Sequence, residues 1–290
     1  MNFNEQYNKY KLHFESVLDK CLNKYCTEDN VIFESIKYSI LDAGKRIRPV
    51  LCYATNEILG GNNELVDVFA LAIEMIHTYS LVHDDLPCMD NDDYRRGKKS
   101  THKKFGENIG VLTGDALLNL AFETALSKSH FSTDDALALS LLSKYSGAKG
   151  MIKGQVLDLL NENNDTAHEK ELLEIYHNKT AKLISAPILI ASILNGKKYF
   201  NQLSEFGYYL GVLFQLVDDV MDVESDFSTM GKSPNKDFEE GKLTSIKVYG
   251  IDKAKELCAF YCEKCISILN EIPNSEFLIE LTKYSLNRRK

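Results

Sequence analysis

The sequence of 290 residues predicts a mainly helical protein, and three observations favour this fold class. Residues 66–86 form an apolar run without glycine or proline, which is typical of a largely buried helix. A second apolar run of helical character begins near residue 206 and extends to residue 226. The chain has only five prolines, and most of its 16 glycines fall at the ends of predicted helices. It lacks an obvious linker, so we expect one domain over residues 1–290.

The composition predicts a globular protein of the cytoplasm. Apolar residues make up 44% of the chain and charged residues 26%, which permits a large core. The net charge of −8 argues against nucleic-acid binding through a general basic field. No secretion signal is evident, and the longest apolar run, residues 183–194, is too short to span a bilayer. We therefore expect neither a nucleic-acid partner nor a membrane-spanning segment.

The seven cysteines fit reduced thiols, because no secretion signal accompanies them. Cys262 and Cys265 have the spacing of a CxxC pair, but no second pair with metal spacing exists. They lie in a helical pattern, where cysteines three residues apart are usually packing residues. We expect no zinc site.

Two helices, over residues 1–28 and about 30–43, are predicted before the first functional turn. This turn reads G-K-R-I-R-P at residues 44–49 and has three cations within four residues. Lysine provides a point charge and arginine a planar fork, so the turn would suit a diphosphate. Taken alone, the segment is better explained as an exposed basic turn.

The first acidic segment, residues 83–96, reads H-D-D-L-P-C-M-D-N-D-D-Y-R-R and follows the apolar run 66–86. Pro87 should end the helix, because the residue before a proline is pushed out of the helical region. The first aspartates then lie at the negative end of the helix dipole, where each costs about 0.3–1 kcal/mol. Asp84 and Asp90 are six residues apart, and we expect the break at Pro87 to return Asp90 toward Asp84.

The second acidic segment, residues 214–226, reads F-Q-L-V-D-D-V-M-D-V-E-S-D. Asp218 and Asp222 are four residues apart and share one helical face, with Asp219 beside them. One such cluster would be explained as a solvated helix end. Two clusters on separate helices, each near arginine or lysine, provide the oxygen ligands that several Mg²⁺ ions need.

Between these segments we expect a helix from about residue 111, a break at residues 147–154 and a surface loop at residues 161–168. Lys179 and Thr180 then occur in a helix that is otherwise apolar on their face. A buried lysine requires an anion, and a substrate diphosphate would serve.

These segments resemble the trans-isoprenyl diphosphate synthases, and within them the bacterial farnesyl diphosphate synthases. The resemblance extends from about residue 40 to residue 245, with motifs in the family's order: G-K-R-I-R-P (44–49), D-D-L-P-C-M-D to R-R-G (84–97), G-Q-V-L-D-L (154–159), K-T-A (179–181) and F-Q-L-V-D-D-V-M-D (214–222). It implies an all-α bundle of long helices around a deep central cavity, with the aspartate motifs facing each other across its mouth. It also implies a homodimer.

The resemblance implies head-to-tail prenyl transfer, in which isopentenyl diphosphate is condensed with dimethylallyl or geranyl diphosphate to farnesyl diphosphate. The allylic C–O bond ionises with the help of several Mg²⁺ ions, the double bond of isopentenyl diphosphate attacks the cation, and a proton is lost. The departing diphosphate is the expected base. Apolar helices would exclude water, which would otherwise quench the cation.

Site residues also follow from the resemblance. The implied metal ligands are Asp84, Asp90, Asp218 and Asp222. The residues expected to take part in catalysis are Asp84, Asp85, Asp90, Arg95, Lys179, Asp218, Asp219 and Lys232. The residues expected to bind substrate are Gly44, Lys45, Arg48, His77, Arg95, Arg96, Lys179, Thr180, Gln215, Lys232 and Lys242, with Gln155 and Asp158 near the allylic substrate. The resemblance implies that Arg95 faces the allylic diphosphate and that the contacts of the second, isopentenyl diphosphate are Lys45, Arg48, His77 and Arg96.

Product length should depend on the residues that precede the first motif. On a helical wheel Ser80 lies beneath Asp84, about 5.4 Å away, while Tyr79 is turned aside, so geometry alone does not choose the floor of the cavity. The resemblance implies Tyr79, because an aromatic residue at this position blocks growth beyond fifteen carbons in bacterial farnesyl synthases. Geranylgeranyl diphosphate remains the alternative product, since C-M-D-N-D-D also resembles plant-type enzymes.

Two other function classes share parts of this pattern. A non-catalytic regulatory subunit of a prenyl synthase typically lacks one aspartate motif, and both are intact here. A class I terpene cyclase has an Asn/Ser/Glu-type second motif, which residues 218–222 do not match. One departure from the family is K-L-T-S-I at residues 242–246, which replaces the usual K-x-T-Y-P. The basic residues 287–290 are of a kind that can approach isopentenyl diphosphate.

Overall fold

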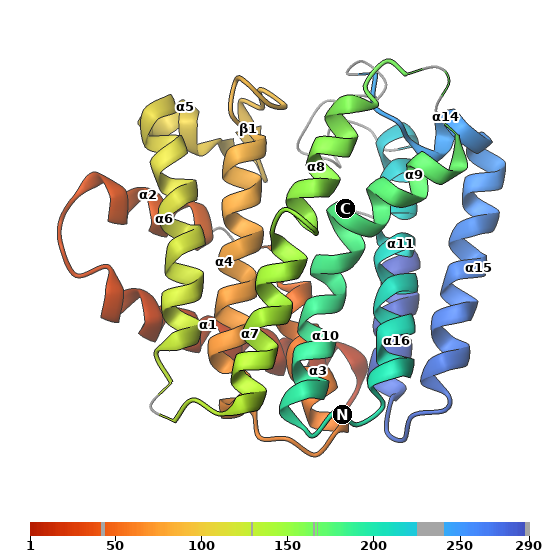
Figure 1. The fold of residues 1–290 in the computed structure, drawn as a ribbon, viewed down its shortest axis with the longest axis horizontal. Coiled ribbons are helices and arrows are strands. Elements are labelled where there is room, and N and C mark those ends of the chain that lie inside the picture. The colour runs from red at the N-terminus through yellow and green to blue at the C-terminus, as the bar shows by residue number, and fades with distance from the viewer. Residues whose placement is uncertain (42–43, 129, 165, 167, 225–240, 288–290) are drawn as a thin grey trace.

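Two long helices, α4 (Asp67–Asp84) and α11 (Phe200–Glu224), carry the two aspartate motifs to the same end of the molecule, at the top of Figure 1. The computed structural model describes residues 1–290 except 42–43, 129, 165, 167, 225–240 and 288–290. Lys232 and residues 288–290 of the basic tail therefore lie outside the described residues.

The other elements complete a bundle of roughly upright helices (Figure 1). They are α1 (Phe3–Tyr25), α2 (Val31–Ile40), α3 (Ile47–Ile58), η1 (Asn63–Leu65), β1 (Tyr94–Arg95), β2 (Lys98–Lys99), α5 (Thr101–Phe105), α6 (Glu107–Leu126), α7 (Thr133–Ser146), α8 (Met151–Leu160), α9 (Glu169–Ile175), η2 (Tyr176–Ala181), α10 (Lys182–Leu194), α14 (Ser245–Tyr249), α15 (Ile251–Leu269) and α16 (Glu276–Leu286). Within the described ranges, the only sheet is the antiparallel pair β1–β2. The predicted all-α fold is confirmed.

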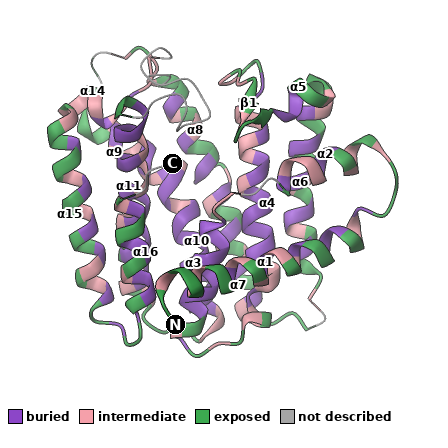
Figure 2. Cartoon of the chain, turned by 180° about the vertical axis from the view of Figure 1, so that it is seen from behind, coloured by how far each residue is buried: buried purple, intermediate pink, exposed green. Residues whose placement is uncertain are grey.

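The core is centred on α4 and α10, which are buried along most of their length (Figure 2). Helix α10 is apolar on every side and continues through Pro187. Outer helices such as α1 and α15 bury one face only, as amphipathic patterns predict. Cys262 and Cys265 are buried in α15 as free thiols, in agreement with their predicted packing role.

Helix boundaries follow the local capping chemistry. The Asn2 side chain accepts from the Glu5 N–H, and the Glu5 side chain accepts in return, which starts α1. The Asn30 side chain caps α2. Helix α4 ends at Asp84, three residues before Pro87, as the restriction on residues that precede proline predicts.

Two predicted boundaries were wrong. Helix α11 begins at Phe200 rather than near residue 206, because its first turn is polar and lies before the apolar run. The break expected at residues 147–154 is confined to residues 147–150, and Gly154 lies inside α8. A Cβ atom on Gly154 would be only 2.1 Å from the Lys179 backbone nitrogen, so this glycine allows α8 to approach η2 closely.

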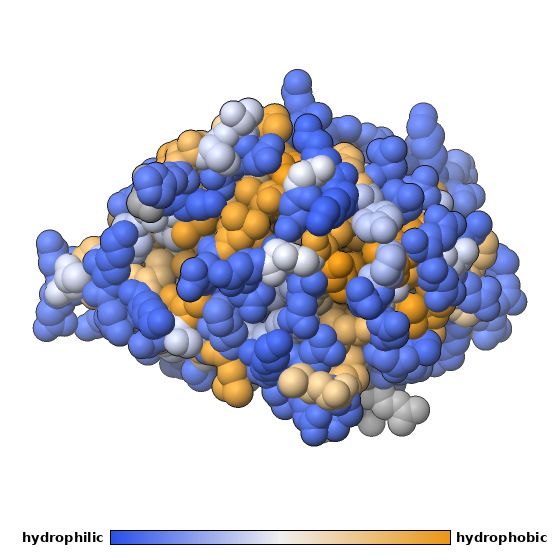
Figure 3. Space-filling model, turned by 90° about the horizontal axis from the view of Figure 1, so that it is seen from below, coloured by the Kyte–Doolittle hydropathy of each residue, from blue (hydrophilic) through white to orange (hydrophobic). Residues whose placement is uncertain are grey.

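Helix α6 is the one described helix that is long and apolar enough to cross a membrane. A helix was predicted here from about residue 111, but the search for uninterrupted apolar runs did not identify it as a membrane candidate, because small polar residues interrupt its apolar residues. It packs against α4 and α2 as part of the bundle. The end of the molecule opposite the aspartate motifs shows mostly hydrophilic side chains with smaller apolar areas between them (Figure 3).

Candidate active site

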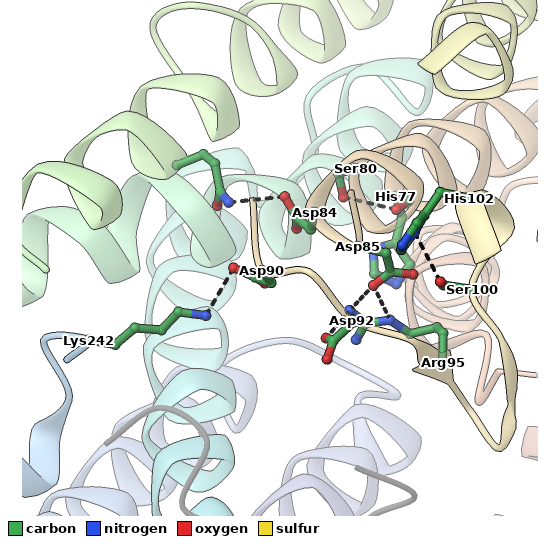
Figure 4. A network of polar contacts seen from close by, with 11 residues as sticks. His77, Ser80, Asp84, Asp85, Asp90, Asp92, Arg95, Ser100, His102 and Lys242 are labelled. Carbon is green, nitrogen blue, oxygen red and sulfur yellow. Dashed lines mark hydrogen bonds and ion pairs between the residues drawn. The ribbon is translucent and has the colours of Figure 1, made fainter. Parts of the chain in front are cut away.

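The first aspartate motif leaves α4 and folds back on itself (Figure 4). The Asp90 N–H donates to the Asp84 carbonyl oxygen at 2.8 Å, so the chain returns Asp90 toward Asp84 as predicted. The Asp84 carboxylate accepts a hydrogen bond of 3.0 Å from the Gln155 side chain of α8. Asp90 forms an ion pair of 3.2 Å with Lys242, which comes from the segment that follows the second motif. The two motifs are thereby connected.

The charge on Asp84 is poorly stabilised by the protein alone. Burial raises the pKa of Asp84 to about 6, Lys179 acts in the opposite direction, and Asp90 raises the pKa further. A cation bound beside these two carboxylates would remove this cost.

Next to these residues, the buried Asp85 forms an ion pair with Arg95, whose side chain is 30% exposed. Asp85 is 3% exposed, and its Oδ1 accepts from both Nε (2.9 Å) and Nη2 of Arg95. Arg95 also reaches Asp92 at 3.2 Å. Arg95 was expected to face the allylic diphosphate, but here its guanidinium is bonded to its own motif, so it organises the loop in this structure.

Lys179 lies in η2, a π-helical turn between α9 and α10. Such turns are rare and frequently occur at functional sites. The Lys179 ammonium forms an ion pair of 2.6 Å with Asp158 of α8. Burial disfavours its charge, but the charges of Asp158 and Asp84 raise the pKa of Lys179 above its usual value. This half-buried lysine therefore has an anionic partner, as the sequence pattern predicted.

The second aspartate motif occupies the last two turns of α11. Asp219 and Asp222 are buried, and Asp218 is half-buried. Asp219 accepts hydrogen bonds from Tyr176, Ser245 and Gln215. Gln215, in turn, accepts from the Thr180 hydroxyl at 2.7 Å. The expected substrate-binding pair Thr180 and Gln215 is thus brought together with Asp219.

A hollow of about 400 Å³, including its open mouth, lies between these elements. It is lined by residues from α8, η2, α11 and the segment before α14, among them Asp158, Tyr176, Lys179, Gln215, Asp219 and Lys242. The hollow therefore brings together Asp219 of the second motif, Asp158 of α8 and two lysines.

The cations of the basic turn, residues 44–49, have different surroundings. Arg46 has a left-handed backbone (φ 55°) and is buried in ion pairs with Glu15 at 2.9 Å and Glu74 at 2.8 Å. It is a structural residue, and the resemblance did not include it among the substrate contacts. The Lys45 ammonium lies 5.7 Å from the centre of the Tyr284 ring.

The remaining predicted contacts for the second diphosphate gather beside this turn. The Arg96 guanidinium packs on Gly44 so closely that a Cβ there would be 2.9 Å from it. Burial and the positive charges of Arg48 and Arg96 hold the pKa of His77 well below its usual value. A neutral His77 among arginines is a suitable partner for an anion that the arginines attract.

The two candidate chain-length residues differ in their surroundings. Ser80 donates its hydroxyl to the His77 carbonyl at 2.9 Å, within its own helix. Tyr79 is buried in the core cluster, and its ring packs edge-on against His83 at 5.8 Å between centroids. Burial raises the pKa of Tyr79 to about 12, followed by the effect of Asp84. The Tyr79 hydroxyl has no hydrogen-bond partner among the described residues.

The donor set suits Mg²⁺, which favours one or two carboxylates together with phosphate oxygens and water over a closed protein cage. In the described part of the chain, no three acidic, histidine or cysteine side chains form such a cage. Asp84 and Asp90 provide one pair of hard oxygen donors, and Asp218 and Asp222 are positioned one turn apart to provide another.

Sequence reasoning missed several residues of this site. Tyr176 lies three residues before Lys179 on the same side of the helix, and a polar ring at that spacing was the available signal. Ser245 was noted only as a departure from the family pattern. The Lys242–Asp90 pair joins residues far apart in sequence, so only the folded chain reveals it.

Comparisons with known proteins agree with this geometry. Residues 29–271 match the family model described as "Polyprenyl synthetase". The farnesyl diphosphate synthase of Micrococcus luteus is 40% identical over 275 residues, which cover 94% of each chain. The chloroplastic geranylgeranyl pyrophosphate synthase of Capsicum annuum is 43% identical over 236 residues, which cover 80% of this chain and 64% of that enzyme.

Solved structures give the same result. A geranyltransferase from Legionella pneumophila matches with a TM-score of 0.88 and 31% identity, covering 99% of this chain and 97% of that one. A geranyltransferase from Helicobacter pylori, in complex with magnesium and isoprenyl diphosphate, matches with a TM-score of 0.81 and 30% identity over 95% of each chain. The chain therefore belongs to the polyprenyl synthetase family.

Proposed function

We propose that this protein is a short-chain trans-prenyltransferase that condenses isopentenyl diphosphate with dimethylallyl or geranyl diphosphate to give farnesyl diphosphate. The observation that carries the proposal is the convergence of both aspartate motifs on one site with Lys179 and Lys242. The ion pair between Lys242 and Asp90 joins the second-motif side to the first, and Asp84 lies within the field of Lys179.

Asp84, Asp90, Asp218 and Asp222 would hold the Mg²⁺ ions, which when bound would neutralise charge on the allylic diphosphate and assist its departure. Lys179 and Lys242 add fixed positive charge where the leaving diphosphate becomes more negative. The pairs Lys179–Asp158 and Lys242–Asp90 keep these ammonium groups in place before substrate arrives. Two substrate diphosphates bring about six negative charges together, so both metal ions and lysines are required.

The second substrate would bind at the basic turn. Lys45, Arg48 and Arg96 supply the cations, with His77 neutral among them. Gly44 keeps the turn close to the Arg96 guanidinium. Lys232 belongs to the same proposal as a cation for the leaving diphosphate, although it lies outside the described residues.

Geranylgeranyl diphosphate is the second candidate product. It is favoured by the identity of 43% to the geranylgeranyl pyrophosphate synthase of Capsicum annuum. Farnesyl diphosphate is favoured by the Micrococcus luteus enzyme, whose whole length this chain nearly matches, and by the buried Tyr79 ring one turn and a residue before Asp84.

A homodimer in the cytoplasm is also part of the proposal. Helices α6 and α8 expose large apolar side chains: Val111, Leu112, Ile152, Val156 and Leu160. Exposed apolar areas of this kind mark protein interfaces. Sedimentation velocity of the wild type and of Leu112→Asp tests it, and a monomeric wild type would contradict it.

The test of function is to incubate the purified protein with Mg²⁺, isopentenyl diphosphate and dimethylallyl diphosphate and to size the dephosphorylated products. We expect mainly fifteen-carbon product, and longer products from Tyr79→Ala. Twenty-carbon product from the wild type would support the second candidate. No product under any Mg²⁺ concentration would contradict prenyl transfer and support a non-catalytic subunit.

A further inference from the structure

Asp219 is the most completely hydrogen-bonded carboxylate of the site. It is 2% exposed. Its Oδ2 accepts from the Tyr176 hydroxyl, from the Ser245 backbone N–H at 2.7 Å and from the Ser245 hydroxyl at 2.9 Å. Its Oδ1 accepts from the Gln215 amide at 3.2 Å. Three donors converge on Oδ2, so a metal ion that binds this oxygen would have to displace them, whereas Oδ1 accepts one hydrogen bond.

These donors come from three different elements. Tyr176 belongs to η2, which also carries Lys179, and Gln215 belongs to α11. Ser245 is the first residue of α14 and follows Lys242 by three residues. The Ser245 N–H also lies 2.9 Å from the Tyr176 hydroxyl, which closes the group. Asp219 therefore fixes the lysine-bearing turn of η2 against the lysine-bearing segment before α14.

The same hollow contains Asp219 and both lysines. Lys179 and Lys242 each line it, together with Tyr176. The spacing of the two ammonium groups depends on how η2 and the segment before α14 are held relative to each other. The described contacts that join them directly are those of Tyr176, Asp219 and Ser245.

We propose that Tyr176 and Ser245 are positioning residues that act through Asp219 to set the spacing of Lys179 and Lys242 for one diphosphate. In this arrangement Asp219 is an anchor, and metal binding in the second motif is left to Asp218 and Asp222. The inference rests on the proposed function. It concerns this chain in particular, because the serine hydroxyl stands where the family pattern noted above has a tyrosine.

The test is calorimetric titration of the full chain with inorganic pyrophosphate in the presence of Mg²⁺. Tyr176→Phe and Ser245→Ala should each weaken pyrophosphate binding about tenfold, the loss expected for one hydrogen bond to a charged group. The double variant should lose much less affinity than the product of the two single losses, because both residues act through one carboxylate. Ser245→Thr keeps the hydroxyl and should restore binding.

Two matched controls separate positioning from general stability. Tyr53→Phe removes the hydroxyl of another buried tyrosine, which donates a hydrogen bond of 2.9 Å to the Asp67 carboxylate. Neither residue lines the hollow. Ser146→Ala removes the hydroxyl of a buried serine that donates to the Leu142 carbonyl. Both should leave pyrophosphate affinity within about twofold, whatever they do to the melting temperature.

The role of Asp219 has its own readout. Asp219→Asn should lower the turnover rate with little change in the Mg²⁺ concentration that gives half-maximal rate, whereas Asp218→Asn should raise that concentration strongly. An equal rise in both variants would identify Asp219 as a metal ligand and overturn the inference.

The outcomes also distinguish this inference from the proposed function. If Tyr176→Phe and Ser245→Ala bind pyrophosphate as the wild type does, the positioning role is wrong and prenyl transfer is unaffected. If the wild type binds pyrophosphate with the expected dependence but forms no prenyl product, the proposed function alone is wrong. A wild type that does not bind pyrophosphate overturns the positioning role as well.

Discussion

The two aspartate motifs differ in their local structure. The first, after α4, lies in a loop whose shape depends on the Asp85–Arg95 pair. The second lies inside α11, and its Asp219 is tied to η2 and α14. In each motif one buried aspartate, Asp85 or Asp219, accepts several hydrogen bonds from protein donors. The comparison predicts that these two carboxylates stabilise the scaffold, and the following variants test this difference within each motif.

The largest expected effect comes from the cation between the two motifs. Lys179→Ala should reduce the turnover rate by about 10²–10³, because a fixed charge next to the leaving group is lost in a site shielded from water. The matched control is Lys153→Ala, which breaks an ion pair of the same length, 2.6 Å, between exposed residues. Steady-state kinetics with geranyl diphosphate would measure both, and similar losses would contradict the role of Lys179.

The scaffolding role of the first motif can be tested by stability. Asp85→Asn should lower the free energy of unfolding by about 1–3 kcal/mol, because the partly exposed Arg95 guanidinium loses its buried partner and keeps only Asp92. Asp93→Asn is the control, since its ion pair with Lys103 is exposed and should be worth less than about 1 kcal/mol. Urea denaturation gives both values. Equal losses of stability in the two variants would contradict the anchoring role of Asp85.

Helix α8 connects the motifs, and its closeness to η2 depends on Gly154. A methyl group there would meet the Lys179 backbone at 2.1 Å, so Gly154→Ala should cost about 1–3 kcal/mol of stability and also reduce activity. Lys153→Ala changes an exposed residue of the same helix, whose ion pair with Glu174 is also exposed, and should cost less than about 1 kcal/mol. An active, stable Gly154→Ala would show that the approach of α8 to η2 is not required.

The smallest effect is expected from Lys242, whose ion pair with Asp90 connects the two motifs. Lys242→Gln should weaken the apparent affinity for the allylic substrate by about tenfold, since one partly buried charge is lost while Lys179 remains. It should also lessen the effect of salt on that affinity. The measurement is the Michaelis constant for geranyl diphosphate at low and high ionic strength. An unchanged constant would place Lys242 outside the binding site.

Much of the fold followed from the sequence, because long apolar runs and proline positions are local signals. The end of α4 before Pro87 and the return of Asp90 toward Asp84 were predicted correctly. The beginning of α11 was not, since its first turn is polar. The π-helical turn of η2, which packs closely against α8 at Gly154, was not predicted, because the apolar pattern does not distinguish it from an α-helix.

The sequence motifs identified most residues of the site but not the contacts between them. The sequence placed Lys179 beside an anion, and the structure supplies Asp158 as that anion in the absence of substrate. The bonding of Arg95 to Asp85 and Asp92 was not foreseen, because by resemblance alone its partner was the substrate. Tyr176 and Ser245 are linked only by the folded chain, so no local pattern could pair them.

The central claim is that both aspartate motifs serve one reaction. The most direct test is single-turnover conversion of geranyl and isopentenyl diphosphates by the wild type, Asp84→Asn and Asp218→Asn, with Asp115→Asn as an exposed acidic control. We predict fifteen-carbon product from the wild type and the control, and a loss of rate of at least about 100-fold in each motif variant. Near-wild-type rates in either motif variant would contradict the claim that both motifs act at one site.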